Sequence, residues 1–346
     1  MKKTIIISIC LLLMIASFAQ KTRIENEMEV ARACGGMEEL SKIKGNWKKL
    51  EDDLAFPDKK LPKSQYPLVF ERIDKMVQLF KEAITDLSGT EPRWYRGMRG
   101  EPYNENGPVA YSVNTLYFNY YCNTIQKKPV LGDETRTWFH VFVNHYNWFC
   151  KKVDDWDINN DGKMITIYRL PPKVGKWKGI TVYEPEVTRG YSRAVIIGHN
   201  GKLPWHTLTK KQYLTGLKNY LELKKKNDLA PQLKDQFRAK VEKYWDDQLR
   251  PVIDYLNNHS EEELKEPAIL EKTSTIIGFS GRFGKESDGV KVIAFSTAYW
   301  NKDLPRYAAQ FMVLYWMWDG YMLATPIRQQ FEDNFPVEKL RALIDK

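Results

Sequence analysis

Residues 157–164 carry oxygen-bearing side chains at a spacing that suits calcium. Asp157, Asn159 and Asp161 occupy the first, third and fifth positions, and a glycine occupies the sixth. This matches the first half of a calcium loop, in which carboxylate and amide oxygens surround the ion. The twelfth position is Tyr168, where such loops have a bidentate glutamate. The segment also fits a hairpin turn before a strand, so a calcium site and a plain turn are the two interpretations.

A second segment interleaves guanidinium groups with aromatic rings. It contains Arg93, Trp94, Tyr95, Arg96 and Arg99. Guanidinium groups pair with phosphates or carboxylates, and aromatic rings stack on flat ligand surfaces. We predict a loop here that binds an anionic glycan or a lipid head group through these five residues. The alternative is a loop that Trp94 pins to a sheet, with its arginines in surface ion pairs.

Paired carboxylates occur at Asp154–Asp155, Glu184–Glu186 and Asp246–Asp247. In an extended chain Glu184 and Glu186 lie on one side, a spacing that acid–base hydrolysis of a glycan can use. This is the basis of an alternative function, a hydrolase acting on envelope glycan or another extracytoplasmic polymer. An edge strand or loop carrying Pro185 explains the same spacing without chemistry.

Patterns for a nucleophile or a metal ligand set are sparse. Residues 278–281 (Gly-Phe-Ser-Gly) miss the nucleophile elbow by one position. His140 and His145 are five residues apart and face different directions on a strand or a helix. His199 and His206 flank a predicted hairpin turn, and no carboxylate accompanies them in sequence. We therefore assign no catalytic residue.

Aromatic residues are abundant, with 11 tryptophans and 19 tyrosines. Most alternate within predicted strands and are expected in the core or on half-buried faces. Trp156, Trp177 and Trp205 fall at loop-like positions, so we expect these three to be the exposed stacking residues.

The first 19 residues have the pattern of a secretory signal peptide. Lys2 and Lys3 form a positive start, Ile5 to Ile15 is a short apolar core, and Ala19 ends a small-residue cleavage site. The predicted mature chain starts at Gln20, is periplasmic or secreted, and has no later apolar run long enough for a transmembrane anchor.

Charge and cysteine content fit an exported protein. The formal charge of +9 falls to +7 without Lys2 and Lys3. This modest excess favours anionic envelope material over nucleic acid as a partner. Cys34, Cys122 and Cys150 remain after cleavage, so one disulfide leaves one thiol over. We prefer Cys122–Cys150 because both lie in aromatic segments; the alternative is three buried thiols.

The clearest secondary-structure signal is a helix from Val69 to Ile84, with apolar residues on one face and a turn at 88–92 to end it. A capping box at Thr209 and Gln212 opens a long helical stretch, and Pro251 is expected to end or kink its second helix. Shorter helices are predicted from Ser260 and over 336–344. Strands are predicted over 116–122, 138–150, 164–170, 194–197, 290–298 and 311–318.

These elements are clustered rather than strictly alternating, which predicts an α+β protein with antiparallel sheets, packed helices and a mid-chain helical segment. After the signal peptide at 1–19, we expect an N-terminal extension at 20–65. An α+β domain at 66–190 and a second α+β region at 191–346 follow, the latter with a helical insertion at 209–267.

The segment from Leu203 to Leu214 (Leu-Pro-Trp-His-Thr-Leu-Thr-Lys-Lys-Gln-Tyr-Leu) resembles a family of uncharacterised exported proteins of Bacteroidota. The segment at 171–179 and the leader ending in Phe18-Ala19-Gln20 are similar too. The resemblance runs from about Val69 to the C-terminus. It implies export and a shared fold, and it implies no activity.

The sequence therefore favours a non-catalytic binding or scaffold protein of the cell envelope. Its ligand is expected to be an envelope component such as an anionic glycan or lipid, and a protein partner is the further alternative. No cofactor is expected unless the calcium interpretation of Asp157, Asn159 and Asp161 holds.

Overall fold

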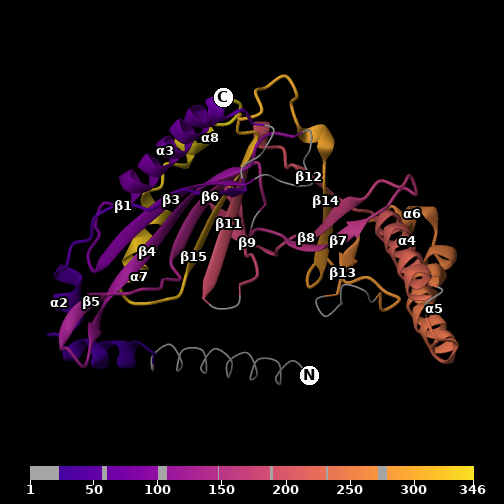
Figure 1. The fold of residues 1–346 in the computed structure, drawn as a ribbon, viewed down its shortest axis with the longest axis horizontal. Coiled ribbons are helices and arrows are strands. Elements are labelled where there is room, and N and C mark those ends of the chain that lie inside the picture. Colours follow the sequence, from indigo (N-terminus) through magenta and orange to yellow (C-terminus); the bar gives the residue numbers. More distant parts are fainter. Residues whose placement is uncertain are drawn as a thin grey trace.

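The computed structural model describes residues 23–56, 61–99, 107–146, 148–187, 190–230, 233–271 and 279–346. It confirms an α+β fold with two mainly antiparallel sheets and packed helices (Figure 1). The predicted signal peptide at residues 1–19 lies outside the described residues. Within the described ranges, no helix has the length and apolar character needed to cross a membrane.

Ten of the described strands form the large sheet, in the order β1-β3-β4-β6-β15-β11-β10-β9, with β2 also on β3 and β5 also on β4. β1 and β2 run parallel to β3, and the other neighbours are antiparallel. The strands are β1 (Lys48–Lys49), β2 (Asp53–Phe56), β3 (Thr90–Arg99), β4 (Tyr111–Asn123), β5 (Lys128–Leu131), β6 (Trp138–Val143), β9 (Lys173–Trp177), β10 (Ile180–Tyr183), β11 (Tyr191–Gly198) and β15 (Phe311–Trp318). Every residue of β15 is buried, as expected for a central strand covered on both faces.

The small sheet has the order β12-β14-β8-β7, with β13 paired to β14. Its strands are β7 (Lys151–Trp156), β8 (Ile165–Arg169), β12 (Trp205–Thr207), β13 (Ile269–Leu270) and β14 (Val290–Phe295). Neighbouring strands of this sheet are antiparallel. Aromatic and aliphatic residues of β8, β12 and β14 pack against one part of the large sheet.

Three helices cover the other face of the large sheet: α3 (Tyr66–Ala83), α7 (Ala324–Asn334) and α8 (Val337–Arg341) (Figure 1). The short helix η1 (Lys63–Gln65) leads into α3. The predicted apolar stripe of α3 is confirmed, because all of its members are buried: Val69, Ile73, Met76, Val77, Phe80 and Ile84. The helix ends at Ala83, and Thr90, Glu91 and Pro92, expected in a turn, belong to β3.

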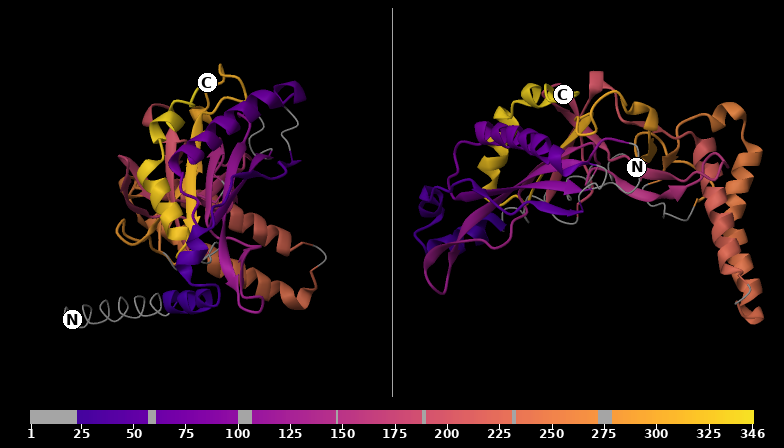
Figure 2. Two further views of the ribbon diagram at one scale, coloured as in Figure 1. Left: turned by 90° about the vertical axis from the view of Figure 1, so that its left-hand side faces the viewer. Right: turned by 45° about the horizontal axis from the view of Figure 1, so that its top comes forward.

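The predicted mid-chain helical segment is confirmed as α4 (Lys210–Asp228), α5 (Asp235–Asn258) and α6 (Glu261–Leu264). Both predicted capping boxes form, at Thr209 with Gln212 and at Ser260 with Glu263. α4 and α5 form a long pair that projects from the small sheet, away from the large sheet (Figure 2).

The second helix of this pair differs from the prediction in two ways. It does not end at Pro251 but continues to Asn258, and Val252 and Tyr255 are held in the core beyond the proline. The helical spacing of Leu233, Phe237, Val241 and Tyr244 in the sequence predicts an inward face, but Phe237 and Tyr244 are 48% and 51% exposed. They lie on the outward side of α5, whereas Trp245 and Leu249 face the core of the small sheet and its helices.

The chain passes between the two sheets more than once, so the predicted ranges do not separate them. The boundary at residue 190 falls between β10 and β11, which pair with each other in the large sheet. The predicted hairpin at residues 200–201 is wrong: the short helix η2 (His199–Gly201) connects β11 of the large sheet to β12 of the small sheet. A third short helix, η3 (Thr297–Tyr299), follows β14.

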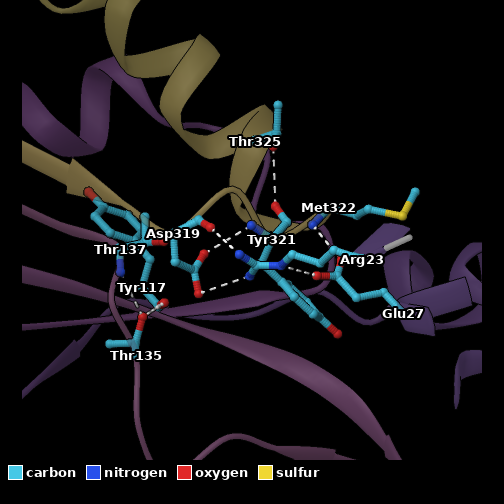
Figure 3. A network of polar contacts seen from close by, with 9 residues as sticks. All are labelled: Arg23, Glu27, Tyr117, Thr135, Thr137, Asp319, Tyr321, Met322 and Thr325. Carbon is cyan, nitrogen blue, oxygen red and sulfur yellow. Dashed lines mark hydrogen bonds and ion pairs between the residues drawn. The ribbon is translucent and has the colours of Figure 1, made fainter. Parts of the chain in front are cut away.

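The segment predicted as an N-terminal extension is joined to the large sheet. A helix over residues 23–32 is followed by α2 (Met37–Lys42). Arg23 bonds the Asp319 carbonyl oxygen at 2.5 Å and Glu27 at 2.9 Å, and the Met322 N–H donates to Glu27 at 3.1 Å (Figure 3). The helix is therefore anchored to the loop between β15 and α7.

The disulfide joins Cys34 to Cys122, with their Cα atoms 5.7 Å apart, so the predicted Cys122–Cys150 pair is wrong. Cys150 is a free, half-buried thiol. The N-terminal helices bring Cys34 against β4, whereas Cys150 packs in the aromatic layer between the two sheets.

Candidate functional site

The register of four adjacent strands places polar and aromatic side chains in rows on the face of the large sheet opposite the helices. One row runs across β3, β4, β6 and β15 through Tyr95, Asn114, His140 and Tyr315. The next row contains Arg93, Leu116, Trp138 and Met317. Paired residues on neighbouring strands share a face, so both rows face the same side of the sheet.

A groove of about 740 Å³ lies on this face; we call it the aromatic groove. Its apolar floor and sides come from three strands, β4, β6 and β15, and a loop: Leu116, Phe118, Trp138, Trp148, Tyr315 and Met317. Its polar rim contains Asp133, Glu134 and Arg136 from the loop before β6, and Glu186 from the loop before β11. The volume and the mixture of aromatic surface with a few polar groups are typical of small-molecule sites.

Trp148 covers the middle of this face. It has a backbone φ of 60° and is 44% exposed, which is unusual for a bulky residue on both counts. Its indole lies 5.3 Å from the Trp138 ring and 5.9 Å from the Tyr315 ring, centre to centre. Trp148 also lines a second pocket of about 120 Å³, which Tyr95 and Asn114 share. The indole therefore separates two hollows on one sheet face.

His140 lies beneath Trp148 and is 1% exposed. Neither of its ring nitrogens has a hydrogen-bond partner among the described residues. Burial lowers its pKa to about 3, so the imidazole is neutral at physiological pH. A buried, unpaired polar group costs about 1–3 kcal/mol, which makes His140 a side chain that would gain from a ligand able to bond it.

The predicted arginine-rich loop is not a loop, because residues 93–99 are part of strand β3. The alternation of the strand sends Arg93 and Tyr95 to the groove side, and Trp94 and Arg96 to the helix side. Arg93 and Arg96 are accommodated in this strand because each guanidinium group is paired with a carboxylate. The side chain of Arg99 lies outside what the structure describes.

Two of these guanidinium groups are already paired with carboxylates. Arg93 bonds Glu91 at 3.0 Å and lies over the Phe118 ring, and Arg96 bonds Asp74 of α3 at 2.6 Å. Burial by itself raises the pKa of Glu91, but hydrogen bonds from Lys48 and Arg93 outweigh it and lower the pKa. Because their guanidinium groups already bond carboxylates, Arg93 and Arg96 have fewer free donors for an anionic ligand than the sequence suggested.

The predicted calcium segment forms the turn between β7 and β8. The Asp157 carboxylate accepts backbone N–H bonds from Asn159, Asp161 and Gly162, at 3.3, 3.3 and 2.8 Å. Asp161 in turn accepts the N–H of Lys163 at 2.9 Å. In the described ranges, no group of three or more His, Cys, Asp or Glu residues is arranged to hold a metal ion.

The predicted carboxylate pairs point in different directions. Glu184 is paired with Arg193, and Glu186 lies at the groove with a loose 3.4 Å contact to Lys151. Asp155 bonds Thr166 and Lys152, and Asp246 and Asp247 pair with lysines of α4 and α5. A carboxylate does accompany one histidine, because Asp345 contacts the ring of His199.

The tryptophans expected to be exposed are largely in the core. Trp156 is fully buried, Trp205 is 9% exposed, and Trp177 is half-buried with its indole N–H donating to the Glu332 carbonyl. Trp148 is exposed and Trp138 is half-buried at the groove, and both come from a segment expected to be a strand up to Cys150. The strand β6 ends at Val143, and the following loop turns Trp148 back over the sheet. The sequence offers one local signal: Trp138, Val141, Phe142, His145, Trp148 and Phe149 also fit a helical spacing, which a regular strand does not explain.

The comparisons with protein-family models, with curated proteins and with solved structures find no match to this chain.

Proposed function

We propose that this chain is an exported, non-catalytic binding protein of the cell envelope that holds a glycan in the aromatic groove. The observation that carries the proposal is the placement of Trp138 and the partly exposed Trp148 beside a rim of charged side chains. Export is supported by the leader pattern of residues 1–19 and agrees with the Cys34–Cys122 disulfide.

A sugar ring suits this arrangement because its two kinds of surface match the groove. The C–H face of a pyranose is apolar and packs on the electron-rich face of an indole. Its hydroxyl groups lie at the ring edge and bond polar side chains such as Glu134, Arg136 and Glu186. The pairing of Arg93 and Arg96 with carboxylates supports a glycan over an anionic lipid head group.

Hydrolysis is the second candidate function, because carboxylates stand on two sides of the groove. Asp133 and Glu134 come from one loop and Glu186 from another. A glycosidase needs two such groups flanking the bond that it cleaves. Incubation of the protein with each bound oligosaccharide, followed by product analysis, separates a hydrolase from a binding protein.

The test uses the chain from Gln20 with a panel of envelope oligosaccharides, anionic lipid vesicles and peptides. A bound ligand at about 100 times its Kd adds about 2.7 kcal/mol to the free energy of unfolding, which is visible as a rise in Tm. We expect an oligosaccharide to give this rise. Trp138→Ala and Trp148→Ala should each weaken its binding by about tenfold, or about 1.4 kcal/mol.

Tyr244→Ala is the matched control, because Tyr244 is an equally exposed aromatic residue on α5, away from the groove. It should leave binding unchanged. Binding of vesicles or peptides alone, or oligosaccharide binding that survives both tryptophan substitutions in folded variants, contradicts the proposal.

A further inference from the structure

The rim of the aromatic groove is acidic, although the chain as a whole is basic. Asp133, Glu134 and Glu186 line it, against the single guanidinium of Arg136. Asp133 and Glu134 are exposed, and within the described ranges neither forms an ion pair. The contact of Glu186 with Lys151 joins two highly exposed side chains and contributes little. The groove therefore presents uncompensated negative charge to its ligand.

The aromatic residues of the groove favour the same sign of ligand charge. The faces of indole and phenol rings are electron-rich and attract cations, most strongly for tryptophan. Trp148 is tilted 39° from Trp138 and stands at 75° to Tyr315, so the three rings present surfaces in different directions. An ammonium group among such rings is attracted without a dedicated carboxylate contact.

His140 packs directly beneath these rings but does not itself line the groove. It is 1% exposed, and its ring centre lies within 6.3 Å of those of Trp138, Trp148 and Tyr315. Its ring nitrogens are unpartnered among the described residues. Because this imidazole is neutral, it adds no positive charge that would repel a cationic ligand in the groove above it.

We infer that the groove selects a glycan whose sugars carry free amino groups, so that the ligand is cationic rather than anionic or neutral. This inference rests on the proposed function, since it assigns a charge class to the ligand of the same groove. It replaces the anionic glycan expected from Arg93, Arg96 and Arg99.

The test compares two probes with one backbone, the tetramer of β-1,4-linked glucosamine and its fully N-acetylated form. Binding is measured by calorimetry at mildly acidic pH, where the free amines are protonated. We expect the amine tetramer to bind about tenfold more tightly, and added salt to weaken its binding more than that of the acetylated tetramer.

The double variant Asp133→Asn with Glu134→Gln removes two charges at constant size. It should abolish the preference for the amine, because the loss of charge weakens binding of the amine tetramer far more than binding of the acetylated tetramer. Asp246→Asn with Asp247→Asn is the control, because it makes the same charge change on the exposed face of α5. This control should keep the preference.

The outcomes separate the two proposals. Equal binding of both tetramers, tighter binding of the acetylated one, or a preference that survives the double variant overturns the charge assignment but leaves a glycan-binding groove. If neither tetramer nor any other oligosaccharide binds, the proposed function fails and the inference fails with it.

Discussion

Trp148 stands edge-on over His140, with ring centres 5.0 Å apart and ring planes at 87°. This contact joins a residue with strained backbone to a buried side chain that lacks hydrogen bonds. The indole is 44% exposed and lies on a loop rather than a strand. Its removal would merge the two hollows that it lines.

We predict that Trp148→Ala makes His140 reactive toward diethylpyrocarbonate, which modifies accessible neutral imidazoles. In the unchanged protein His140 should stay unmodified, because it is 1% exposed. Mass spectrometry of peptides after brief treatment measures both. His206 is exposed and serves as the internal control that reacts in either protein. Protection of His140 in the variant would show that other groups, not Trp148, exclude solvent from it.

A second prediction concerns stability in acid. Burial lowers the pKa of His140 from 6.5 to about 3, so between these values the unfolded chain binds a proton that the folded chain does not. The free energy of unfolding therefore rises with pH through this window, by up to about 1.4 kcal/mol per pH unit, and falls as the pH drops below 6.5.

His140→Phe should remove this contribution while keeping the ring shape. At neutral pH we expect the variant to be at least as stable as the unchanged protein, because two unpaired nitrogens are replaced by apolar atoms. Below pH 6.5 its stability should fall less steeply. Urea unfolding of both proteins at several pH values measures the difference, and parallel pH profiles would contradict the assignment.

Local features of the fold were predictable because their causes are local. The stripe of α3, the capping boxes at Thr209 and Ser260, and strand β15 each depend on residues within a few positions of one another. The alternation of β3 was obscured by its arginines, whose partners come from elsewhere. Arg96 is accommodated by Asp74 of α3, which the sequence places 22 residues away.

The site itself was not predictable, because it depends on strand order. His140 and Tyr315 are neighbours only because β6 pairs with β15, and this pairing brings together segments about half the chain apart. No spacing within either segment specifies that pairing. Trp148 was missed for a related reason: its position over the sheet follows from the loop after Val143, and its residues favour a continued strand.

The disulfide yields a third prediction. Cys34 and Cys122 are separated by 88 residues, so the bond closes a long loop and restricts the unfolded chain. Cys34→Ser with Cys122→Ser should lower the free energy of unfolding by about 2–4 kcal/mol under non-reducing conditions. Urea unfolding measures the loss.

Cys150→Ala is the control for this pair. Cys150 is the free thiol, so its removal should leave the oxidised chain from Gln20 without any thiol that reacts after denaturation. If the denatured Cys150→Ala variant instead showed any free thiol, or if the double serine variant kept its full stability, the Cys34–Cys122 bond would be contradicted.

The last prediction separates the two interpretations of the turn between β7 and β8. Three backbone N–H groups donate to the Asp157 carboxylate, whereas the side chain of Asn159 makes no hydrogen bond with the described residues. If the turn is held by backbone hydrogen bonds to its carboxylates and not by an ion, Asp157→Ala should lower the free energy of unfolding by about 1 kcal/mol, and Asn159→Ala should have almost no effect. A calcium site would need both side chains as ligands, so both variants would then lose a calcium-dependent rise in Tm.

Thermal unfolding in calcium and in chelator measures each case. We expect equal Tm values in the two solutions and an effect of Asp157→Ala in both, because the carboxylate oxygens are already occupied by the backbone.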